Sequence, residues 1–266
     1  MKTSNRSTVC PICRSTDCAA PHWRRPCFLR CRRCGAIFRD PFPTDSELGA
    51  LYRSSWTDSE AHSDETGGTD RELGHRLSAA LLRELGRCDF SGQRILDFGA
   101  GRGGMSAALR DRRADVVAVE PFGDAGLRHL GIPVYRDLGE VPAELQFDGI
   151  VAIEVAEHLR DPCGALRQLA DALRHGGWLL LTTPNPLGLA ALLRGRRWRS
   201  ALNAGHILFF PAPTLHRALC ELGFVKVRRT RWIIRFPDAS PPHAIVQSVL
   251  QWLQLGGGLR FLAVKG

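Results

Sequence analysis

The segment ILDFGAGRGG, Ile95–Gly104, constrains the fold of this 266-residue chain more than any other. Its first residues are apolar and predict a short buried strand over 94–98, and its glycines recur at every second position before a helical stretch over 103–113. Glycine lets a backbone turn sharply and come close to a ligand. A strand, a glycine loop and a helix in this order predict a nucleotide-cofactor site at the carboxyl end of the strand.

Strand and helix signals alternate through the rest of the central region. Further strands are predicted at 115–120, 132–135, 147–153 and 178–183. Helices are predicted at 124–130, at 162–176 after the N-cap Asp161, and at 214–222. A strand-like stretch over 224–236, an amphipathic stretch over 244–255 and a last strand over 259–265 follow. This alternation predicts an α/β fold with a doubly wound parallel sheet, whose ligands bind at the carboxyl edge of the strands.

Two carboxylates narrow the choice of cofactor. The glycine pattern alone is ambiguous between a dinucleotide and another adenosine cofactor. Asp97 stands directly before the glycines, where a carboxylate suits a cationic amino-acid group and not a pyrophosphate. Glu120 ends the second strand, where it can accept hydrogen bonds from both ribose hydroxyls. Together they indicate S-adenosylmethionine (SAM).

Five segments then resemble, in order, the motifs of class I SAM-dependent methyltransferases, in particular the branch with the ubiquinone-biosynthesis-type O-methyltransferases. They are ILDFGAGRGG, VVAVEP, FDGIVAIEVAEHLRDP, LRHGGWLLLTTPN and GHILFFPAPTLHRALCELGF, within residues 91–236. The resemblance implies a Rossmann-like seven-stranded class I methyltransferase sheet with one antiparallel strand, which the tail at 259–265 can supply. It also implies residue roles: the methionine end at Asp97, Gly99, Ala100 and Gly101, the ribose at Glu120, and the adenine edge at Asp137.

The motif EVAEHL follows the fourth strand, where the sheet edge faces the methyl group of the cofactor. Three interpretations stay open. His158 or Glu157 is a general base for a substrate hydroxyl. Alternatively, Glu154, Glu157, His158 and the distant His206 together bind Mg²⁺ or another divalent cation, as in similar small-RNA 2′-O-methyltransferases and some ubiquinone-type enzymes. In the third interpretation, Glu157 and His158 only cap and pack the turn.

The amino-terminal region contains two Cys-x-x-Cys pairs, Cys10/Cys13 and Cys31/Cys34, separated by 17 residues. This spacing is typical of a zinc ribbon, in which four thiolates complete a tetrahedron and leave no open position for catalysis. We therefore expect a structural Zn²⁺ in a small module, which serves either in substrate recognition or in docking on the main domain. The other five cysteines are expected to be spare or buried thiols.

These features divide the chain into three predicted regions. Residues 1–42 form the zinc-ribbon-like module, 43–90 a linker with leading helices, and 91–266 the methyltransferase domain. The polar stretch over 58–70 is predicted to be a loop, and the leucines over 75–87 predict a helix. An insertion at 187–208 is expected to cover the substrate pocket, where Trp198 either stacks on a substrate ring or packs against the protein.

The net charge and the arginine clusters do not decide which class of partner the chain binds. The net charge is +9, and arginines cluster within 24–39, 194–199 and 226–235. They suit a nucleic acid, an anionic small substrate or simply a solvated surface. No apolar run is long enough for a membrane span and the first residues lack a secretory pattern, so a cytoplasmic location is expected. The oligomeric state is not indicated.

The sequence thus predicts a methyltransferase that modifies a small-molecule acceptor, at a hydroxyl oxygen, in secondary-metabolite, quinone or glycan biosynthesis. One alternative is an RNA or protein methyltransferase whose zinc module and arginines grip the macromolecule. Another is a SAM-binding module without catalytic activity.

Overall fold

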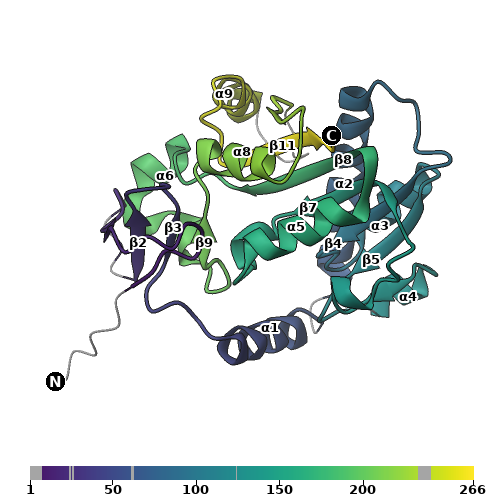
Figure 1. Ribbon diagram of the computed structural model, residues 1–266. Coiled ribbons are helices and arrows are strands. Elements are labelled where there is room, and N and C mark those ends of the chain that lie inside the picture. Colours follow the sequence, from purple (N-terminus) through teal and green to yellow (C-terminus); the bar gives the residue numbers. More distant parts are fainter. Residues whose placement is uncertain (1–7, 24, 26, 61–62, 124, 233–240) are drawn as a thin grey trace.

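The computed structural model describes residues 8–23, 25, 27–60, 63–123, 125–232 and 241–266. Within these residues the chain forms two β-sheets, a small one near the amino terminus and a large one flanked by helices (Figure 1). No helix in this part of the chain has the length and apolar character needed to cross a bilayer.

The large sheet has seven strands in the spatial order β10-β11-β8-β7-β4-β5-β6. The strands are β4 Arg94–Phe98, β5 Asp115–Val119, β6 Val134–Tyr135, β7 Phe147–Ile153, β8 Leu173–Pro184, β10 Arg228–Arg229 and β11 Gly258–Val264. Strands β4 to β8 are parallel, whereas β11 runs antiparallel to both of its neighbours, β8 and β10. The expected sheet with one reversed strand is thus confirmed, and the tail supplies that strand.

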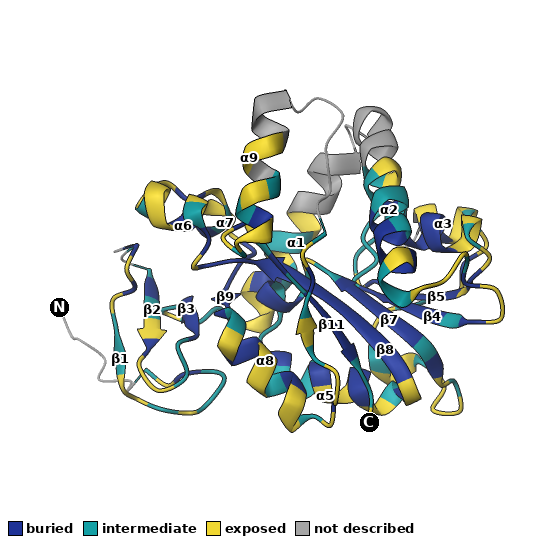
Figure 2. Ribbon diagram, turned by 90° about the horizontal axis from the view of Figure 1, so that it is seen from above, coloured by how far each residue is buried: buried dark blue, intermediate teal, exposed yellow. Residues whose placement is uncertain are grey.

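Helices cover both faces of the large sheet, which is why its central strands are continuous apolar runs. Helices α2 Ser63–Leu85 and α3 Gly104–Asp111 pack on one face, and α5 Pro162–Ala172 and α8 Ala212–Glu221 pack on the other. Figure 2 shows β7 and β8 as buried along most of their length between these layers. Helices α2 and α3 approach so closely that a Cβ on Gly104 would lie 2.5 Å from the carbonyl oxygen of Asp70.

The small sheet joins three amino-terminal strands to one strand from the middle of the chain. Its order is β1-β2-β3-β9, all antiparallel, with β1 Cys18–Ala19, β2 Phe28–Cys31, β3 Ile37–Arg39 and β9 Leu208–Phe209. Helix α1, Asp45–Glu60, then leads away from this sheet. It begins with a capping box, in which the Glu47 carboxylate accepts from the Thr44 N–H at 2.7 Å and the Glu47 N–H donates to the Thr44 hydroxyl at 3.3 Å.

The remaining helices complete the described chain. They are α4 Ala125–His129, η1 Leu138–Glu140, η2 Ala156–His158, α6 Leu189–Arg194, η3 Gly195–Arg197, α7 Arg199–Leu202 and α9 Pro241–Trp252.

The strands predicted at 94–98 and 147–153 match β4 and β7 residue for residue. The predicted loop over 58–70 is wrong, because α1 extends to Glu60 and α2 begins at Ser63. Two glycines in this stretch cost a helix about 1 kcal/mol each, but the leucine-rich remainder of α2 is buried on the sheet and stabilises the whole helix.

Two further boundaries differ from expectation. Helix α5 ends at Ala172 and not near Gly176, because β8 already begins at Leu173, which pairs with Phe147 of β7. In the described part of the strand-like stretch over 224–236, β10 pairs with β11, and Phe224 forms an isolated bridge with Lys265, directly after β11. Residues 233–236 lie outside the described part of the chain.

Candidate active site

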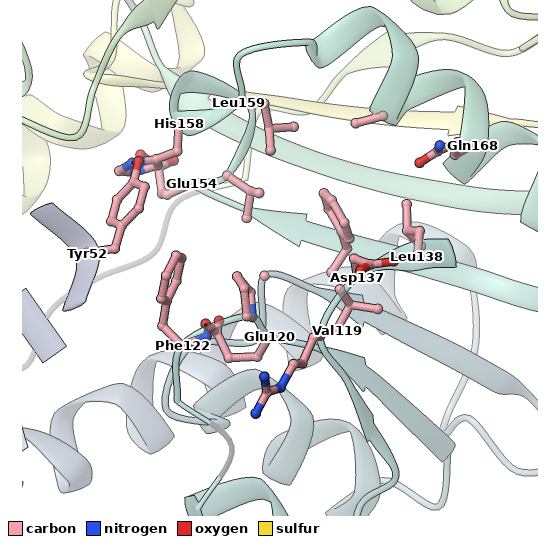
Figure 3. A pocket seen from close by; sticks show the side chains of 16 residues that line it. Tyr52, Val119, Glu120, Phe122, Asp137, Leu138, Glu154, His158, Leu159 and Gln168 are labelled. Carbon is pink, nitrogen blue, oxygen red and sulfur yellow. Dashed lines mark hydrogen bonds between the residues drawn. The ribbon is translucent and has the colours of Figure 1, made fainter. Parts of the chain in front are cut away.

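A cavity of about 450 Å³ opens at the carboxyl ends of β4, β5 and β7. Gly99, Glu120 and Glu154, each of which directly follows one of these strands, line it. Tyr52 of α1 and His158 of η2 also line the cavity, and His158 lies beside Glu154 (Figure 3). The cavity therefore lies at the edge where a doubly wound parallel sheet binds its ligands.

The glycine loop follows β4 closely around this edge. The N–H groups of Gly99 and Ala100 both donate to the Val119 carbonyl, at 2.8 and 3.1 Å. Gly99 has a φ of +72°, and a Cβ there would lie 2.5 Å from a methyl carbon of Val155. Glycine satisfies both the backbone conformation and this close contact, so the loop can pack tightly against the turn after β7.

Asp97 lies beneath this loop and is only 2% exposed. Its carboxylate accepts a 2.5 Å hydrogen bond from the Ser106 hydroxyl on α3. Burial raises the pKa of Asp97 to about 6, although the bond from Ser106 opposes this rise. Asp97, Ala100 and Gly101 are not among the residues that line the cavity, so their predicted contacts with the cofactor stay predictions.

Glu120 lines the cavity and has its carboxylate fixed by backbone donors. Its two oxygens accept hydrogen bonds from Gly101 N–H at 2.8 Å and from Phe122 N–H at 2.9 Å. Burial raises the pKa of this carboxyl group, and the backbone bonds oppose the rise. Glu120 therefore presents an oriented acceptor to the cavity, at the position predicted for the ribose.

Asp137 also lines the cavity, beside Leu138. One carboxylate oxygen caps η1 by accepting from the N–H groups of Gly139 and Glu140, at 2.7 and 3.2 Å. The cap fixes the side chain after β6, and its assignment to the adenine edge stays a prediction.

The residues of the EVAEHL motif turn away from β7 in a strained conformation. Glu154 has a φ of +54°, a region that non-glycine residues rarely adopt. Neighbouring threonines of β8 hold the two glutamates: Thr182 donates to Glu154 and Thr183 donates to Glu157, each at 2.9 Å. Consecutive residues of one strand thus hold the two carboxylates.

The structure brings the distant His206 to this motif. One ligand atom from each of Glu157, His158 and His206 lies within 4.8 Å of the other two. The imidazole rings of His158 and His206 are 4.7 Å apart between centroids and nearly perpendicular. His206 Nε2 is 3.9 Å from a Glu157 carboxylate oxygen. We refer to these three side chains as the acid–histidine centre, which Glu154 adjoins.

Tyr52 determines the orientation of one ring of this centre. Its hydroxyl oxygen is 2.8 Å from Nδ1 of His158 and 3.2 Å from the Gly205 carbonyl oxygen. The Gly205 carbonyl, which can only accept, also interacts with the His158 ring. This arrangement places the proton of neutral His158 on Nδ1 and leaves a lone pair on Nε2.

Burial strongly affects the charge of the centre. It lowers the pKa of both His158 and His206 to about 4, so both rings are neutral at pH 7. Burial, and then the nearby Glu154, raise the pKa of Glu157 well above its ordinary value. Glu157 Oε1 is buried and has no hydrogen-bond partner among the described residues. Such a group favours either a shared proton or a bound cation.

The four cysteines of the two pairs also come together. Their sulfur atoms lie within 4.8 Å of one another, with Cys10···Cys34 and Cys13···Cys31 at 3.5 Å. Sulfur atoms bound tetrahedrally to Zn²⁺ at about 2.3 Å are about 3.8 Å apart. A hydrogen bond from Cys34 lowers the pKa of Cys10 to about 5, which favours a thiolate in this cluster. The cluster therefore fits a closed zinc site.

Sequence reasoning missed some of the cavity wall and left one side chain undecided. Tyr52 falls within the predicted linker region over 43–90, and Phe122, whose ring is 5.2 Å from that of Tyr52, has no predicted role. The helical spacing of Leu48 and Tyr52 is a signal that could place Tyr52 on the packed face of α1. Trp198 is 4% exposed and packs edge-on against Trp23, so it is a packing residue and does not stack on a substrate.

Comparison with known proteins identifies the family. The family model Methyltransf_23, described as a methyltransferase domain, matches residues 69–228, which is more than half of the chain. The chain belongs to this methyltransferase domain family. This membership and the sheet order place it among the class I SAM-dependent methyltransferases by family and fold.

Curated relatives share a shorter region with the chain. The ubiquinone biosynthesis O-methyltransferase of Pseudomonas aeruginosa strain UCBPP-PA14 is 31% identical over 110 residues, which are 37% of this chain and 47% of the relative. The protein with the same description from Aeromonas salmonicida strain A449 is 34% identical over 105 residues, 35% of this chain and 44% of the relative. The chain thus spans about half the length of the curated relatives that it matches.

Solved structures share the fold over most of the chain. The 1,6-didemethyltoxoflavin-N1-methyltransferase of Burkholderia thailandensis, solved with 1,6-didemethyltoxoflavin and S-adenosylhomocysteine, aligns with a TM-score of 0.58 and 20% identity over 93% of this chain and 99% of its own. A SAM-dependent methyltransferase from Archaeoglobus fulgidus aligns with a TM-score of 0.53 and 21% identity over 73% of this chain and 94% of its own.

Proposed function

We propose that the protein transfers a methyl group from SAM to a hydroxyl oxygen of a small-molecule acceptor. One observation carries this proposal: a single cavity joins the glycine loop and Glu120 on one side to Glu154 and His158 on the other. A cofactor held at the first side would direct its methyl group toward the second. The description of the curated relatives as O-methyltransferases supports oxygen as the acceptor atom.

The cofactor would be held by the residues around the β4 and β5 turns. Glu120 would accept hydrogen bonds from the ribose, with its carboxylate oriented by Gly101 and Phe122. Gly99 would allow the methionine end to approach the backbone, with Asp97, Ala100 and Gly101 beside it, and Asp137 would meet the adenine. SAM is already an activated donor, so the protein contributes mainly position and exclusion of water.

The acid–histidine centre would hold a divalent cation such as Mg²⁺, with Glu154 beside it. Its chemistry fits: Glu157 offers a buried oxygen that has no partner in the described part of the chain, and the neutral His158 offers a lone pair on Nε2 that Tyr52 orients through Nδ1. When bound, the cation would lower the pKa of an acceptor hydroxyl. A pKa of about 4 makes His158 a weak base at neutral pH, which favours its use as a ligand over use as a general base.

The four clustered cysteines would hold one structural Zn²⁺. Each Cys-x-x-Cys pair forms a knuckle, and the Cys34 N–H lies 3.5 Å from the sulfur of Cys31, a contact that favours a thiolate there. All four positions of a tetrahedral ion would be filled by protein sulfur, so this metal would stabilise the module and take no part in methyl transfer.

The proposal is tested by cofactor binding and product analysis. Calorimetry with S-adenosylhomocysteine should give a 1:1 complex, and Glu120→Ala should weaken it by about 10- to 100-fold, because a charged hydrogen-bond acceptor is removed. The exposed Glu144→Gln serves as a matched control and should bind as wild type does. Tritium from methyl-labelled SAM should enter phenolic or alcoholic small molecules, and EDTA should lower the rate. Label found only in RNA or protein would overturn the proposal.

A further inference from the structure

The small sheet reaches directly into the candidate active site. Strand β9 belongs to the methyltransferase region by sequence, yet it pairs with β3 of the amino-terminal region that carries the four clustered cysteines, residues 8–42, which we call the cysteine module. Ile37 lies opposite Phe209 and Phe38 opposite Leu208. His206 lies two residues before β9. The cysteine module therefore determines where the backbone that carries His206 enters the site.

Arg39, the last residue of β3, makes this link. Its N–H donates to the Ile207 carbonyl at 2.9 Å, and its guanidinium reaches the carbonyl oxygens of His206 and Asn203 at 3.4 and 3.3 Å. The guanidinium also lies over the Phe28 ring, 5.5 Å from its centroid. The backbone N–H and the side chain of one residue thus bind both ends of the loop that carries His206.

The same loop is bound to the acid–histidine centre from its other side. The Ile207 N–H donates to the Glu157 carbonyl at 2.9 Å. Ile207 therefore connects two elements: its carbonyl accepts from β3 of the module, and its N–H donates to η2 of the site. The loop between α7 and β9 is held between two rigid elements, so a shift of β3 would move His206 relative to Glu157.

The module itself is anchored at two more points. Thr214 of α8 donates to the carbonyl of Cys34, and the Trp23 indole donates to the Pro186 carbonyl at 3.3 Å. Trp23 also packs against Phe209 of β9, with ring centroids 5.2 Å apart. These contacts bury a large aromatic cluster between the module and the main domain and so hold the module in a fixed place.

The cysteines lie at the turn that sets β3. Cys31 ends β2, its N–H donates to the Ala36 carbonyl at 2.9 Å, and Cys34 lies in the turn between β2 and β3. The turn is closed by a bond from the Gly35 N–H to the Cys31 carbonyl at 2.9 Å. The cysteine cluster and Arg39 thus belong to one hairpin.

We propose that this hairpin is a positioning device for the active site, in which Arg39 holds His206 in place beside Glu157 and His158. The proposal rests on the function proposed above. Arg39 is a positioning residue, since it contacts the backbone of His206 and not the reacting groups. The module then serves catalysis from within the same chain, and gripping a macromolecule is not its main role.

The test compares Arg39→Ala with Arg39→Lys and with a control, Arg33→Ala, which changes an exposed arginine of the same module. Each variant is purified with zinc, and its zinc content and melting temperature are measured. The first readout is the set of ¹H–¹⁵N ring signals of His158 and His206, assigned with His206→Asn. Arg39→Ala should shift and broaden both sets, whereas Arg33→Ala should superimpose on wild type. This readout needs neither acceptor nor added metal.

The second readout is Mn²⁺ binding to the zinc-loaded protein, followed by electron paramagnetic resonance. Arg39→Ala should weaken it by about tenfold, as is usual when a group that orients a metal ligand is lost. Affinity for S-adenosylhomocysteine should stay within about twofold in all variants, because Arg39 is not among the residues that line the cavity with Glu120. Arg39→Lys keeps the charge but cannot bind both carbonyls as a fork does, so it should give an intermediate effect.

The outcomes separate the two proposals. If Arg39→Ala is folded and zinc-loaded and its histidine ring signals and Mn²⁺ affinity match wild type, the positioning role is wrong. If Arg39→Ala does not fold, Arg39→Lys decides by the same criteria. If wild type binds no Mn²⁺, the cation site of the proposed function fails, while the ring signals still test the positioning role. RNA binding that is lost in Arg33→Ala, with unchanged ring signals in Arg39→Ala, would indicate a recognition module instead.

Discussion

The hydroxyl of Tyr52 lies 2.8 Å from Nδ1 of His158, although the two residues are 106 positions apart in the chain. Tyr52 is on α1, outside the region that the methyltransferase family model matches, and His158 is on η2 within it. Helix α1 is therefore part of the candidate active site and not only a connection between the cysteine module and the main domain.

Tyr52→Phe tests this relationship. The substitution keeps the ring contact with Phe122 but removes the oxygen that orients the His158 imidazole. We expect methyl transfer to fall about tenfold, in line with the loss of other groups that orient a ligand. Affinity for S-adenosylhomocysteine, measured by calorimetry, should not change. A variant as active as wild type would show that the Gly205 carbonyl alone orients the ring.

The cysteine cluster gives a prediction for metal content. Purified protein should contain about one zinc per chain by elemental analysis, because four thiolates saturate one ion. The double variant Cys31→Ser/Cys34→Ser should lose the zinc and melt at a lower temperature. Cys88→Ser/Cys220→Ser changes two exposed cysteines and is the matched control, which should keep the zinc and the melting temperature of wild type. Equal zinc in the two double variants would contradict the assignment.

Much of this organisation could be predicted from the sequence. The runs RILDF and FDGIVAI are apolar and short, so β4 and β7 were recognised to the residue. The predicted group of Glu154, Glu157, His158 and His206 came from the resemblance, because spacing alone cannot give such a pairing. The structure brings Glu157, His158 and His206 together, and Glu154 is not one of the three. Both Cys-x-x-Cys pairs were also grouped correctly, since their spacing is itself the signal.

The contacts that cross between regions could not be predicted in this way. The pairing of β9 with β3 joins residues about 170 positions apart through two residues on each strand, which is too short for a periodic signal. Tyr52 lies in the site because α1 packs beside Phe122, and that packing depends on tertiary structure. The helical conformation of residues 63–70 was missed for a similar reason, because it depends on the burial of the leucines later in α2.

Asp97 gives a prediction for pH dependence. Burial raises its pKa to about 6 from the ordinary 3.8, so the folded state holds this proton more tightly than the unfolded chain does. The contribution of Asp97 to stability is then fully present below pH 4 and is lost as the pH rises through 6, by roughly 3 kcal/mol in all. Asp97→Asn has no such proton. In urea unfolding without cofactor, wild type should lose stability relative to Asp97→Asn between pH 4 and pH 7. A constant difference across this range would show that the carboxyl group is not perturbed.

Glu157→Gln should separate stability from function. Burial and the neighbouring Glu154 raise the pKa of Glu157 well above its ordinary value, so ionisation of this carboxyl group costs folding free energy as the pH rises. Glutamine has nearly the same shape, can still accept from Thr183 and carries no charge. In EDTA, the stability of the variant relative to wild type should therefore rise from pH 4 to pH 7, where the variant should be at least as stable as wild type. The same substitution removes the anionic ligand, so Mn²⁺ binding and methyl transfer should both be lost.

Thermal unfolding at the two pH values and Mn²⁺ titration measure these effects of Glu157→Gln, with the exposed Glu144→Gln as the control. Glu157→Gln protein that is less stable at high pH and still binds Mn²⁺ would mean that Glu157 is a structural residue and that the cation site lies elsewhere.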